Sequence, residues 1–383
     1  MLYPFLLLLP LIASVEQGDR VCGEDISNLW LDVVVAVDNS RGMTKEGITQ
    51  IAANIATVFG TISRIGTGYD DPRSTRIGLV TYNEAANVIA TLTTFNNTND
   101  FLTTLFNNLG NVSNTDTTYL AKGLTAAEQI FEDGPPRRNF QKLVIIYASA
   151  YREDGANSPI AIADRLKTSG IYVVTVGFDQ KSDPALLLAL GNVASPRFNF
   201  GNGDANMVGE IQGALVQVNC FCRSLWVQYK LDYNDSSSYK YGVCLKSVLL
   251  SASWMAAKFS CQSLIKNGYL ATEYDQQKHD FVFDVAKNGS SFHQPYSYHI
   301  GLSYVNGGWY WQQPSGLPLI PLKSTFWLPN YPTPSLSNAP GVMNQGDELS
   351  AGWKNINQYS VPEYYICEVI SCDTDNYCDM ENT

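Results

Sequence analysis

The chain has 383 residues with 25 basic and 36 acidic side chains, which gives a net charge of −11. It is longer than one typical domain of about 100–200 residues, and a hydrophobic content of 45% can fill buried cores, so general disorder is excluded. The acidic balance argues against nucleic-acid binding, because contacts with phosphates need an excess of Lys and Arg. Only 3 histidines and no Cys-x-x-Cys pair argue against a zinc-centred protein.

Residues 1–14 predict a secretory signal peptide. The run MLYPFLLLLPLIA is apolar, too short to span a bilayer, and followed by small residues near a cleavage site at Ala13–Ser14. No later run of about 18 apolar residues predicts a membrane span. We therefore expect a secreted, extracellular protein, in which cysteines can form disulfides. Four asparagines begin Asn-x-Ser/Thr sequons and predict a glycoprotein: Asn96, Asn111, Asn234 and Asn288.

The stretch between Cys22 and Cys220 alternates between strand and helix patterns. Continuous apolar runs typical of buried strands occur at 31–37, 77–82, 88–92, 142–148 and 171–178. Helical periodicity occurs at 44–62, 99–109, 120–131, 160–167, 184–190 and 207–218. This alternation predicts an α/β fold with a doubly wound, mainly parallel sheet, whose ligands bind beyond the carboxyl ends of the strands.

The loop after the first strand reads DNSRG and resembles the first loop of a von Willebrand factor type A domain, whose order of elements is also similar. That family's metal-ion-dependent adhesion site uses an Asp-x-Ser-x-Ser loop, a Thr from a second loop and an Asp from a third, a set of oxygens that suits Mg²⁺. The resemblance implies Asp38, Ser40 and Thr118 as site residues. Gly42 stands where the second Ser belongs, and Ser149 stands where the Asp belongs.

These two replacements predict a degenerate adhesion site. A lost hydroxyl and a lost carboxylate remove charge that a divalent ion needs to offset its dehydration. We therefore expect that no cofactor is required and that the retained side chains hydrogen-bond loop backbone, with Mg²⁺ or Ca²⁺ binding as the less favoured alternative. A nearby acid, Asp116, Glu153 or Asp154, could supply a substitute carboxylate.

The composition changes after Cys222, where Trp, Tyr, Gly and Pro become frequent. A helix is expected at 253–261 (SWMAAKFSC), followed by YHIGL, WYW and YYICE at 298–302, 309–311 and 364–368. In this order the four motifs resemble a C-type lectin-like domain, which is a mixed α+β fold. We expect Trp309 and Trp311 in its core.

The lectin-like resemblance also implies which cysteines pair and where the domains begin and end. It implies the pairs Cys22–Cys220, Cys222–Cys244, Cys261–Cys367 and Cys372–Cys378, whereas sequence alone allows 105 pairings of eight cysteines. The expected layout is a signal peptide at 1–14, a von Willebrand factor A-like domain at 22–220, a C-type lectin-like domain at 222–369, and a short tail at 370–383 with a disulfide loop.

The sugar site of the lectin family is altered in this chain. That family holds Ca²⁺ with a Glu-Pro-Asn or Gln-Pro-Asp loop, a later Glu and a Trp-Asn-Asp strand. Here Pro332, a candidate for a cis peptide bond, lacks those flanking ligands, and Lys354 puts an ammonium where a ligand belongs. We predict no conventional Ca²⁺-dependent sugar site. The remaining ligand-binding candidates are Trp327, Tyr331, Thr333, Asp347, Glu348, Trp353 and Asn355.

No catalytic constellation is found, and we predict that the chain is not an enzyme. It has no Gly-x-Ser-x-Gly elbow, His-Glu-x-x-His motif or Walker loop. His299 is expected to pack near the core, His293 lies in a loop, and His279 is expected in a charged, exposed stretch. None of the three accompanies a nucleophile.

The domain order resembles secreted nematode C-type lectins that carry an A domain. This resemblance implies a secreted recognition protein that binds carbohydrate or glycoconjugate without a conventional Ca²⁺ site, with a role in innate defence. The alternative is an extracellular protein-interaction or adhesion module that uses the A domain and binds no sugar. The expected partner is accordingly a glycan or an extracellular protein.

Overall fold

The computed structural model describes residues 18–60, 63–178, 184–289, 292–334, 341–347 and 349–378. The signal-peptide prediction at 1–14 lies outside these residues. The described chain divides into two compact units. The first unit contains residues 21–246 and 369–378, and the second contains residues 18–20 and 247–368. Each of them therefore includes a segment from the opposite end of the sequence.

The first unit is built on a six-stranded sheet with the order β3-β2-β1-β4-β5-β6. β3 is antiparallel to β2, and the other neighbours run parallel. The strands are β1 Leu31–Asp38, β2 Arg76–Tyr82, β3 Ala86–Ala90, β4 Gln141–Ala148, β5 Ile171–Gly177 and β6 Asn199–Gly201. The helices are α1 Lys45–Phe59, α2 Thr98–Asn108, α3 Leu120–Asp133, α4 Pro159–Thr168, α5 Pro184–Val193 and α6 Met207–Asn219. The predicted doubly wound, mainly parallel sheet is confirmed.

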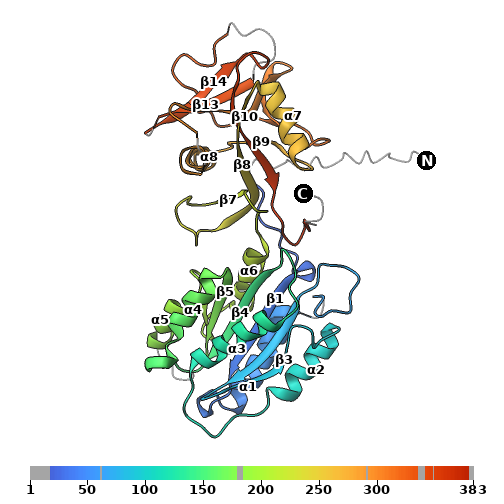
Figure 1. Ribbon diagram of the computed structural model, residues 1–383, viewed down its shortest axis with the longest axis vertical. Coiled ribbons are helices and arrows are strands. Elements are labelled where there is room, and N and C mark those ends of the chain that lie inside the picture. The colour runs from blue at the N-terminus through green and yellow to red at the C-terminus, as the bar shows by residue number, and fades with distance from the viewer. Residues whose placement is uncertain are drawn as a thin grey trace, which may run out of the picture. The chain divides into compact units, whose positions relative to one another are not determined.

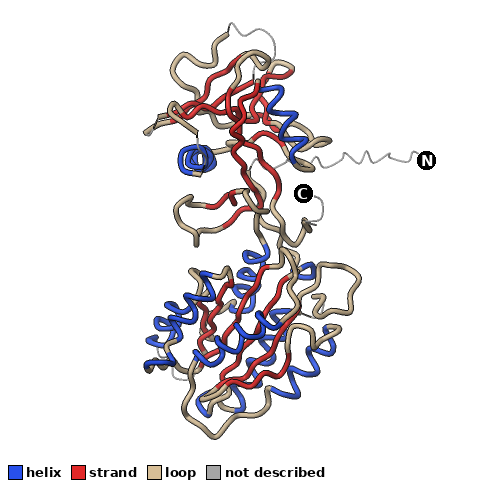
Figure 2. Tube along the Cα trace, in the orientation of Figure 1, coloured by secondary structure: helices blue, strands red, loops and turns tan. Residues whose placement is uncertain are grey.

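Helices cover both faces of this sheet, as Figures 1 and 2 show. Every residue of β1 is buried, because its side chains alternate between two cores. Val33 and Val35 pack with α1, α2 and α6, whereas Val34 and Ala36 pack with α3, α4 and α5. The apolar run of this strand is thus explained by burial on two sides, and its polar end, Asp38, reaches the carboxyl edge of the sheet.

The remaining strands form a nine-stranded sheet with the order β12-β11-β10-β15-β8-β7, in which β13 pairs with β10 and β14, and β9 pairs with β15. The strands are β7 Val227–Lys230, β8 Lys240–Ala252, β9 Tyr269–Leu270, β10 Tyr296–Val305, β11 Gly308–Trp311, β12 Ile320–Pro321, β13 Gly341–Gly346, β14 Ala351–Ile356 and β15 Glu363–Ile370. The helices are α7 Trp254–Leu264 and α8 Gln276–Asn288. β7 belongs to the first unit, and β8 and β15 pass through both units.

Three tryptophans form the centre of the second unit. Trp254, Trp311 and Trp353 are all buried, and the indole N–H of Trp254 donates to the carbonyl of Ile300 at 2.8 Å. Trp311 therefore lies in the core, as expected. Trp309 is only half-buried, which corrects the expectation that it is a core residue. Trp309 and Trp311 lie two positions apart and share one side of β11, but Trp309 is at the start of the strand beside the exposed turn at 306–307, where the core covers only part of its ring.

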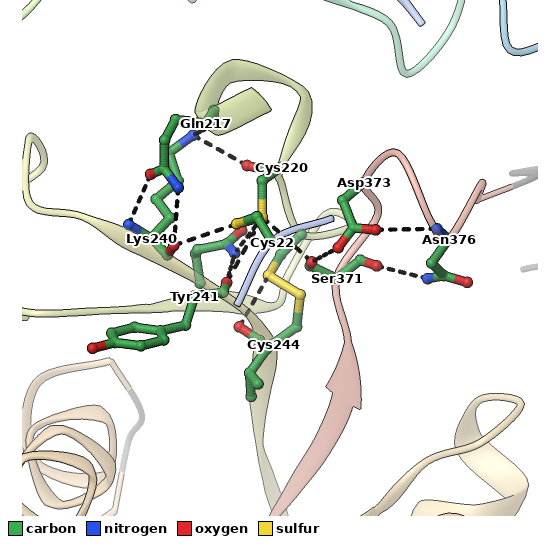
Figure 3. The surroundings of a disulfide bond; sticks show 12 residues. Cys22, Gln217, Cys220, Lys240, Tyr241, Cys244, Ser371, Asp373 and Asn376 are labelled. Atoms are coloured by element: carbon green, nitrogen blue, oxygen red, sulfur yellow. Dashed lines mark hydrogen bonds between the residues drawn. A yellow bond between two sulfur atoms is a disulfide. The ribbon is translucent and has the colours of Figure 1, made fainter. Parts of the chain in front are cut away.

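The structure contains four disulfides: Cys22–Cys220, Cys222–Cys244, Cys261–Cys367 and Cys372–Cys378. These are the pairs that the lectin-like resemblance implies. Three of them lie in the first unit, where the tail after β15 also packs. Figure 3 shows this region, in which Ser371 donates to Asp373 at 3.0 Å and Asn376 donates to the carbonyl of Ser371. Residues 371–378 of the tail therefore pack as part of the first unit.

Candidate functional site

The adhesion-like site lies where β1 and β4 end side by side. Asp38 ends β1, and Ser149 follows β4, whose Tyr147 is paired with Val37. One carboxylate oxygen of Asp38 accepts the backbone N–H of Ser40 at 2.8 Å. The other accepts the N–H of Ser149 at 3.1 Å and its hydroxyl at 2.5 Å. Both oxygens of this buried carboxylate are thus already hydrogen-bonded by the chain itself.

Thr118 completes the set of retained residues but differs from the other two. Its hydroxyl is buried and has no hydrogen-bond partner, which is unusual because buried polar groups are nearly always paired. The predicted hydrogen bonding to loop backbone is therefore found around Asp38 but not at Thr118. A Cβ added at Gly42 would lie 3.3 Å from the Ser149 hydroxyl, so the two replaced positions are neighbours in space.

The acids that could substitute for the missing carboxylate are engaged elsewhere. Asp116 forms an exposed ion pair with Arg41 at 2.7 Å. Asp154 accepts hydrogen bonds from Tyr119 and Asn157, and Glu153 likewise accepts from neighbouring side chains. Within the described part of the chain, no cluster of three or more His, Cys, Asp or Glu could hold a metal. One hydrogen-bonded carboxylate is a poor donor set for a divalent ion, so these residues do not fit one.

The altered sugar site of the second unit lies in the loop before β13 and in β14. The Tyr331–Pro332 peptide bond is cis. Asn355 of β14 accepts the backbone N–H of Thr333 at 2.8 Å and donates to its carbonyl at 3.0 Å. These two ligand candidates are thus bonded to each other and fasten the loop to the sheet. Lys354 bonds to Gln345, and its ammonium lies 5.9 Å from the ring centre of Tyr331. A fixed positive charge beside the loop opposes cation binding.

Two other candidates of this region, Trp353 and Asp347, are engaged within the fold. Trp353 is buried, so its indole has no face free for a ligand, and this corrects its prediction as a ligand-binding residue. The ring packs against Trp311 and Phe326, and its indole N–H donates to Glu273, 80 positions earlier. Asp347 is exposed and accepts from the N–H groups of Leu349 and Ser350, which makes it a turn residue. Glu348 lies outside the described residues.

A buried ion pair behind this loop was not predicted from the sequence. Glu273 accepts the indole N–H of Trp353 at 2.6 Å and lies 2.6 Å from Nδ1 of His279. Burial lowers the pKa of His279, but the Glu273 carboxylate outweighs that effect, so the net pKa is raised. The ring of His279 stacks on Phe326 at 4.5 Å. The prediction of an exposed His279 is wrong, because α8 turns the residue into the core, where a carboxylate offsets its charge.

Three aromatic side chains form a partly exposed row at the edge of the core of the second unit, which we call the aromatic strip: Tyr304, Trp309 and Trp327. Ring centres are 5.2 Å apart between Tyr304 and Trp309, and 4.9 Å apart between Trp309 and Trp327. Tyr304 is exposed, and the two indoles are half-buried. Trp327 also packs edge-on against the buried Trp353 at 5.5 Å. The strip is therefore a contiguous, partly exposed aromatic surface, of which the sequence predicted only Trp327.

The fold and these sites define the class of protein: an α/β adhesion-type domain joined to a lectin-type domain. The model of the von Willebrand factor type A domain matches residues 32–214, and the model of the lectin C-type domain matches residues 250–369. The chain therefore contains a von Willebrand factor type A domain followed by a lectin C-type domain. Both families support an extracellular recognition or adhesion role and are generally non-enzymatic.

A relative from Caenorhabditis elegans, the C-type lectin domain-containing protein 160, is 27% identical over 93% of this chain. The alignment covers 56% of the relative, so the chain spans little more than half of that protein's length. This similarity extends through both domains of the chain.

Solved structures are similar to parts of the chain. Proximal thread matrix protein 1 from the mussel byssus is 20% identical over 51% of this chain and 47% of its own, with a TM-score of 0.40. Another structure of that protein has a zinc-occupied MIDAS motif. A calcium-independent type II antifreeze protein is 19% identical over 40% of this chain and 96% of its own, with a TM-score of 0.29.

Proposed function

We propose that this protein is a secreted, non-enzymatic recognition protein that binds carbohydrate through the aromatic strip of its second unit, without Ca²⁺. Two features of the second unit support the proposal. The aromatic strip is partly exposed, and the Lys354 ammonium stands where the lectin family has a Ca²⁺ ligand. Flat aromatic faces stack on the apolar C–H faces of sugar rings and need no metal. Lys354, held beside Tyr331, opposes a Ca²⁺ ion at the usual position.

Secretion and glycosylation are part of this proposal. Four disulfides are typical of oxidising compartments. In the part of the chain that the structure describes, no helix has both the length and the apolar character to cross a bilayer. The sequon asparagines Asn96, Asn111, Asn234 and Asn288 are all exposed, so each is accessible to glycosylation. A role in innate defence would follow if the bound glycans are microbial.

The test is a glycan array probed with the full secreted chain, in EDTA and in Ca²⁺. Trp327→Ala should reduce the signal strongly in both buffers, because it removes one ring of the strip. Tyr359→Ala is the matched control, since Tyr359 is an exposed aromatic residue of the same unit outside the strip, and it should leave the signal unchanged. If no glycan binds and a pull-down recovers a protein partner through the first unit, the adhesion alternative replaces this proposal.

A further inference from the structure

The first unit contains a cavity of about 680 Å³ at the edge opposite the adhesion-like site. Gln141 and Ile171, the first residues of β4 and β5, lie in its wall, whereas Asp38 ends β1. Ligand pockets usually have volumes of about 300–1,000 Å³, so the cavity is large enough for a small organic molecule. It lies away from the carboxyl edge where ligands of such sheets usually bind.

The hairpin of β7 and β8 closes one side of this cavity and is fastened to α6. Lys240 donates its backbone N–H to the side chain of Gln217 at 3.0 Å, and Gln217 donates back to the carbonyl of Lys240 at 3.2 Å. Figure 3 shows these two bonds beside the Cys22–Cys220 disulfide. The cavity is therefore bounded by elements that are tied together.

The cations of this wall do not favour an anionic ligand. The Lys240 ammonium donates to three oxygens, the hydroxyl of Tyr172 at 3.2 Å and the carbonyls of Gln217 and Cys220 at 2.9 and 3.1 Å. An ammonium has three protons, so these bonds use all of its donors. Lys167 pairs with an acid outside the cavity, Asp164, at 3.0 Å. The ammonium groups of Lys240 and Lys167 thus bind partners within the protein and do not favour an anionic ligand.

The remaining groups favour a neutral, hydroxyl-rich ligand. Arg197 and Glu210 line the cavity, are exposed, and carry opposite charges, so their effects on a single cation or anion offset each other and neither kind of ion is favoured. Hydroxyl groups can accept from a guanidinium and donate to a carboxylate. Tyr172 and Phe198, with ring centres 6.2 Å apart, add aromatic faces, and the Lys240 ammonium at 5.1 Å holds the Tyr172 ring in place.

We propose that this cavity binds a neutral saccharide, at a site separate from the aromatic strip of the second unit. The saccharide has two candidate sources. One is a free extracellular sugar. The other is the chain's own glycan, because the sequon at Asn234 ends at Ser236, which lines the cavity.

Gly213 of α6 allows the cavity to be filled by a single substitution. It lines the cavity, and a Cβ added there would meet no atom within 4 Å. Gly213→Phe should project a ring into the open space, and Gly213→Ala is the matched control, because it adds only a methyl group to the same helix position. Thermal unfolding of both variants checks that each is folded.

The experiment is saturation-transfer NMR on the full chain with N,N′-diacetylchitobiose, lactose and maltose, followed by titration of any disaccharide that binds. Gly213→Phe should weaken that binding about tenfold or more, whereas Gly213→Ala should stay within about twofold. Trp327→Ala should not change it, which separates this site from the aromatic strip. Binding by the glycosylated wild-type chain identifies a free sugar as the ligand. Binding only after Asn234→Gln identifies the chain's own glycan as the occupant.

Two results would overturn the proposal. One is that none of the three disaccharides binds either the wild-type chain or Asn234→Gln. The other is that a folded Gly213→Phe variant binds a disaccharide as tightly as the wild type, because the sugar would then lie elsewhere.

Discussion

Single side chains decide whether the adhesion-like site and the altered sugar site can hold a cation. In the first unit, Ser149 replaces a carboxylate and donates its hydroxyl to Asp38 at 2.5 Å. In the second unit, Lys354 places an ammonium beside the loop. These departures could be predicted from the sequence, because they are changes of residue type within motifs. The lack of a hydrogen-bond partner for the Thr118 hydroxyl could not be predicted, because it depends on the positions of all neighbouring groups.

Restoring the two lost ligands should restore a metal site in the first unit. In the double variant Gly42→Ser with Ser149→Asp, Mg²⁺ at ten times its dissociation constant should stabilise the fold by about 1.4 kcal/mol. Thermal unfolding with and without Mg²⁺ measures this effect, and adding Asp38→Ala should abolish it. The wild-type chain should show no Mg²⁺ effect. A wild-type response that Asp38→Ala removes would contradict the account of a degenerate site.

His299 should make the second unit sensitive to acid. Burial lowers its pKa to about 4 in the folded chain, whereas an unfolded histidine titrates near 6.5. Because the folded pKa is depressed, stability is fully present above about pH 6.5 and is lost as the pH falls toward 4, by about 3 kcal/mol in total. Urea unfolding across this range should show that loss, and His299→Gln should flatten it.

His293→Gln is the matched control for that experiment, because His293 is exposed in the same unit. It should keep the wild-type dependence on pH. An unchanged slope in His299→Gln would mean that another group causes the acid sensitivity.

At the scale of single elements, α8 shows where sequence reasoning failed. Its Lys278 and His279 are consecutive and charged, which suggested an exposed stretch, yet both are buried. Lys278 pairs with Asp19 and lies 3.4 Å from Glu368, while His279 pairs with Glu273. Asp19 is 259 positions away from Lys278, and no local pattern reveals such a partner. The apolar spacing of Phe281, Val282 and Val285 within 281–286, after a capping Asp, was the signal that could have located this helix.

The segment at residues 18–20 should therefore contribute to the stability of the second unit. Asp19→Asn removes one partner of a buried ion pair and should cost about 3 kcal/mol, because the Lys278 charge remains buried. Chemical unfolding measures this loss. Asp280→Asn, an exposed change on the same helix, should cost less than about 0.5 kcal/mol. Equal effects of the two substitutions would show that the Asp19 contact does not stabilise the fold.

At the scale of the whole molecule, the alternation of apolar runs predicted five of the six strands of the first sheet, because parallel strands buried on both faces have a distinctive composition. It missed β6, which has only three residues and no apolar run. The second unit was predicted only by its resemblance, since its short strands and loops have weak patterns. The division into units could not be predicted. The tail after β15 packs in the first unit, where Trp30 donates to the carbonyl of Asp373 at 3.2 Å and contacts Tyr377.

The disulfides should differ in their contributions to the stability of the whole chain. Cys22–Cys220 spans 198 positions, and Cys372–Cys378 spans 6. A longer closed loop restricts the unfolded chain more, so replacing the first pair with serines should cost about 5 kcal/mol and the second about 2 kcal/mol. Unfolding of the two double-serine variants in denaturant tests this order. The reverse order would show that native-state packing, not loop closure, sets the stabilisation.

The central claim is that the second unit recognises carbohydrate without Ca²⁺. The most direct measurement is the dissociation constant of the full chain for its best array glycan, determined in EDTA and again in excess Ca²⁺. We predict equal constants in the two buffers and a loss of binding in Trp327→Ala. Binding that disappears in EDTA, or that persists unchanged in Trp327→Ala, would contradict the account.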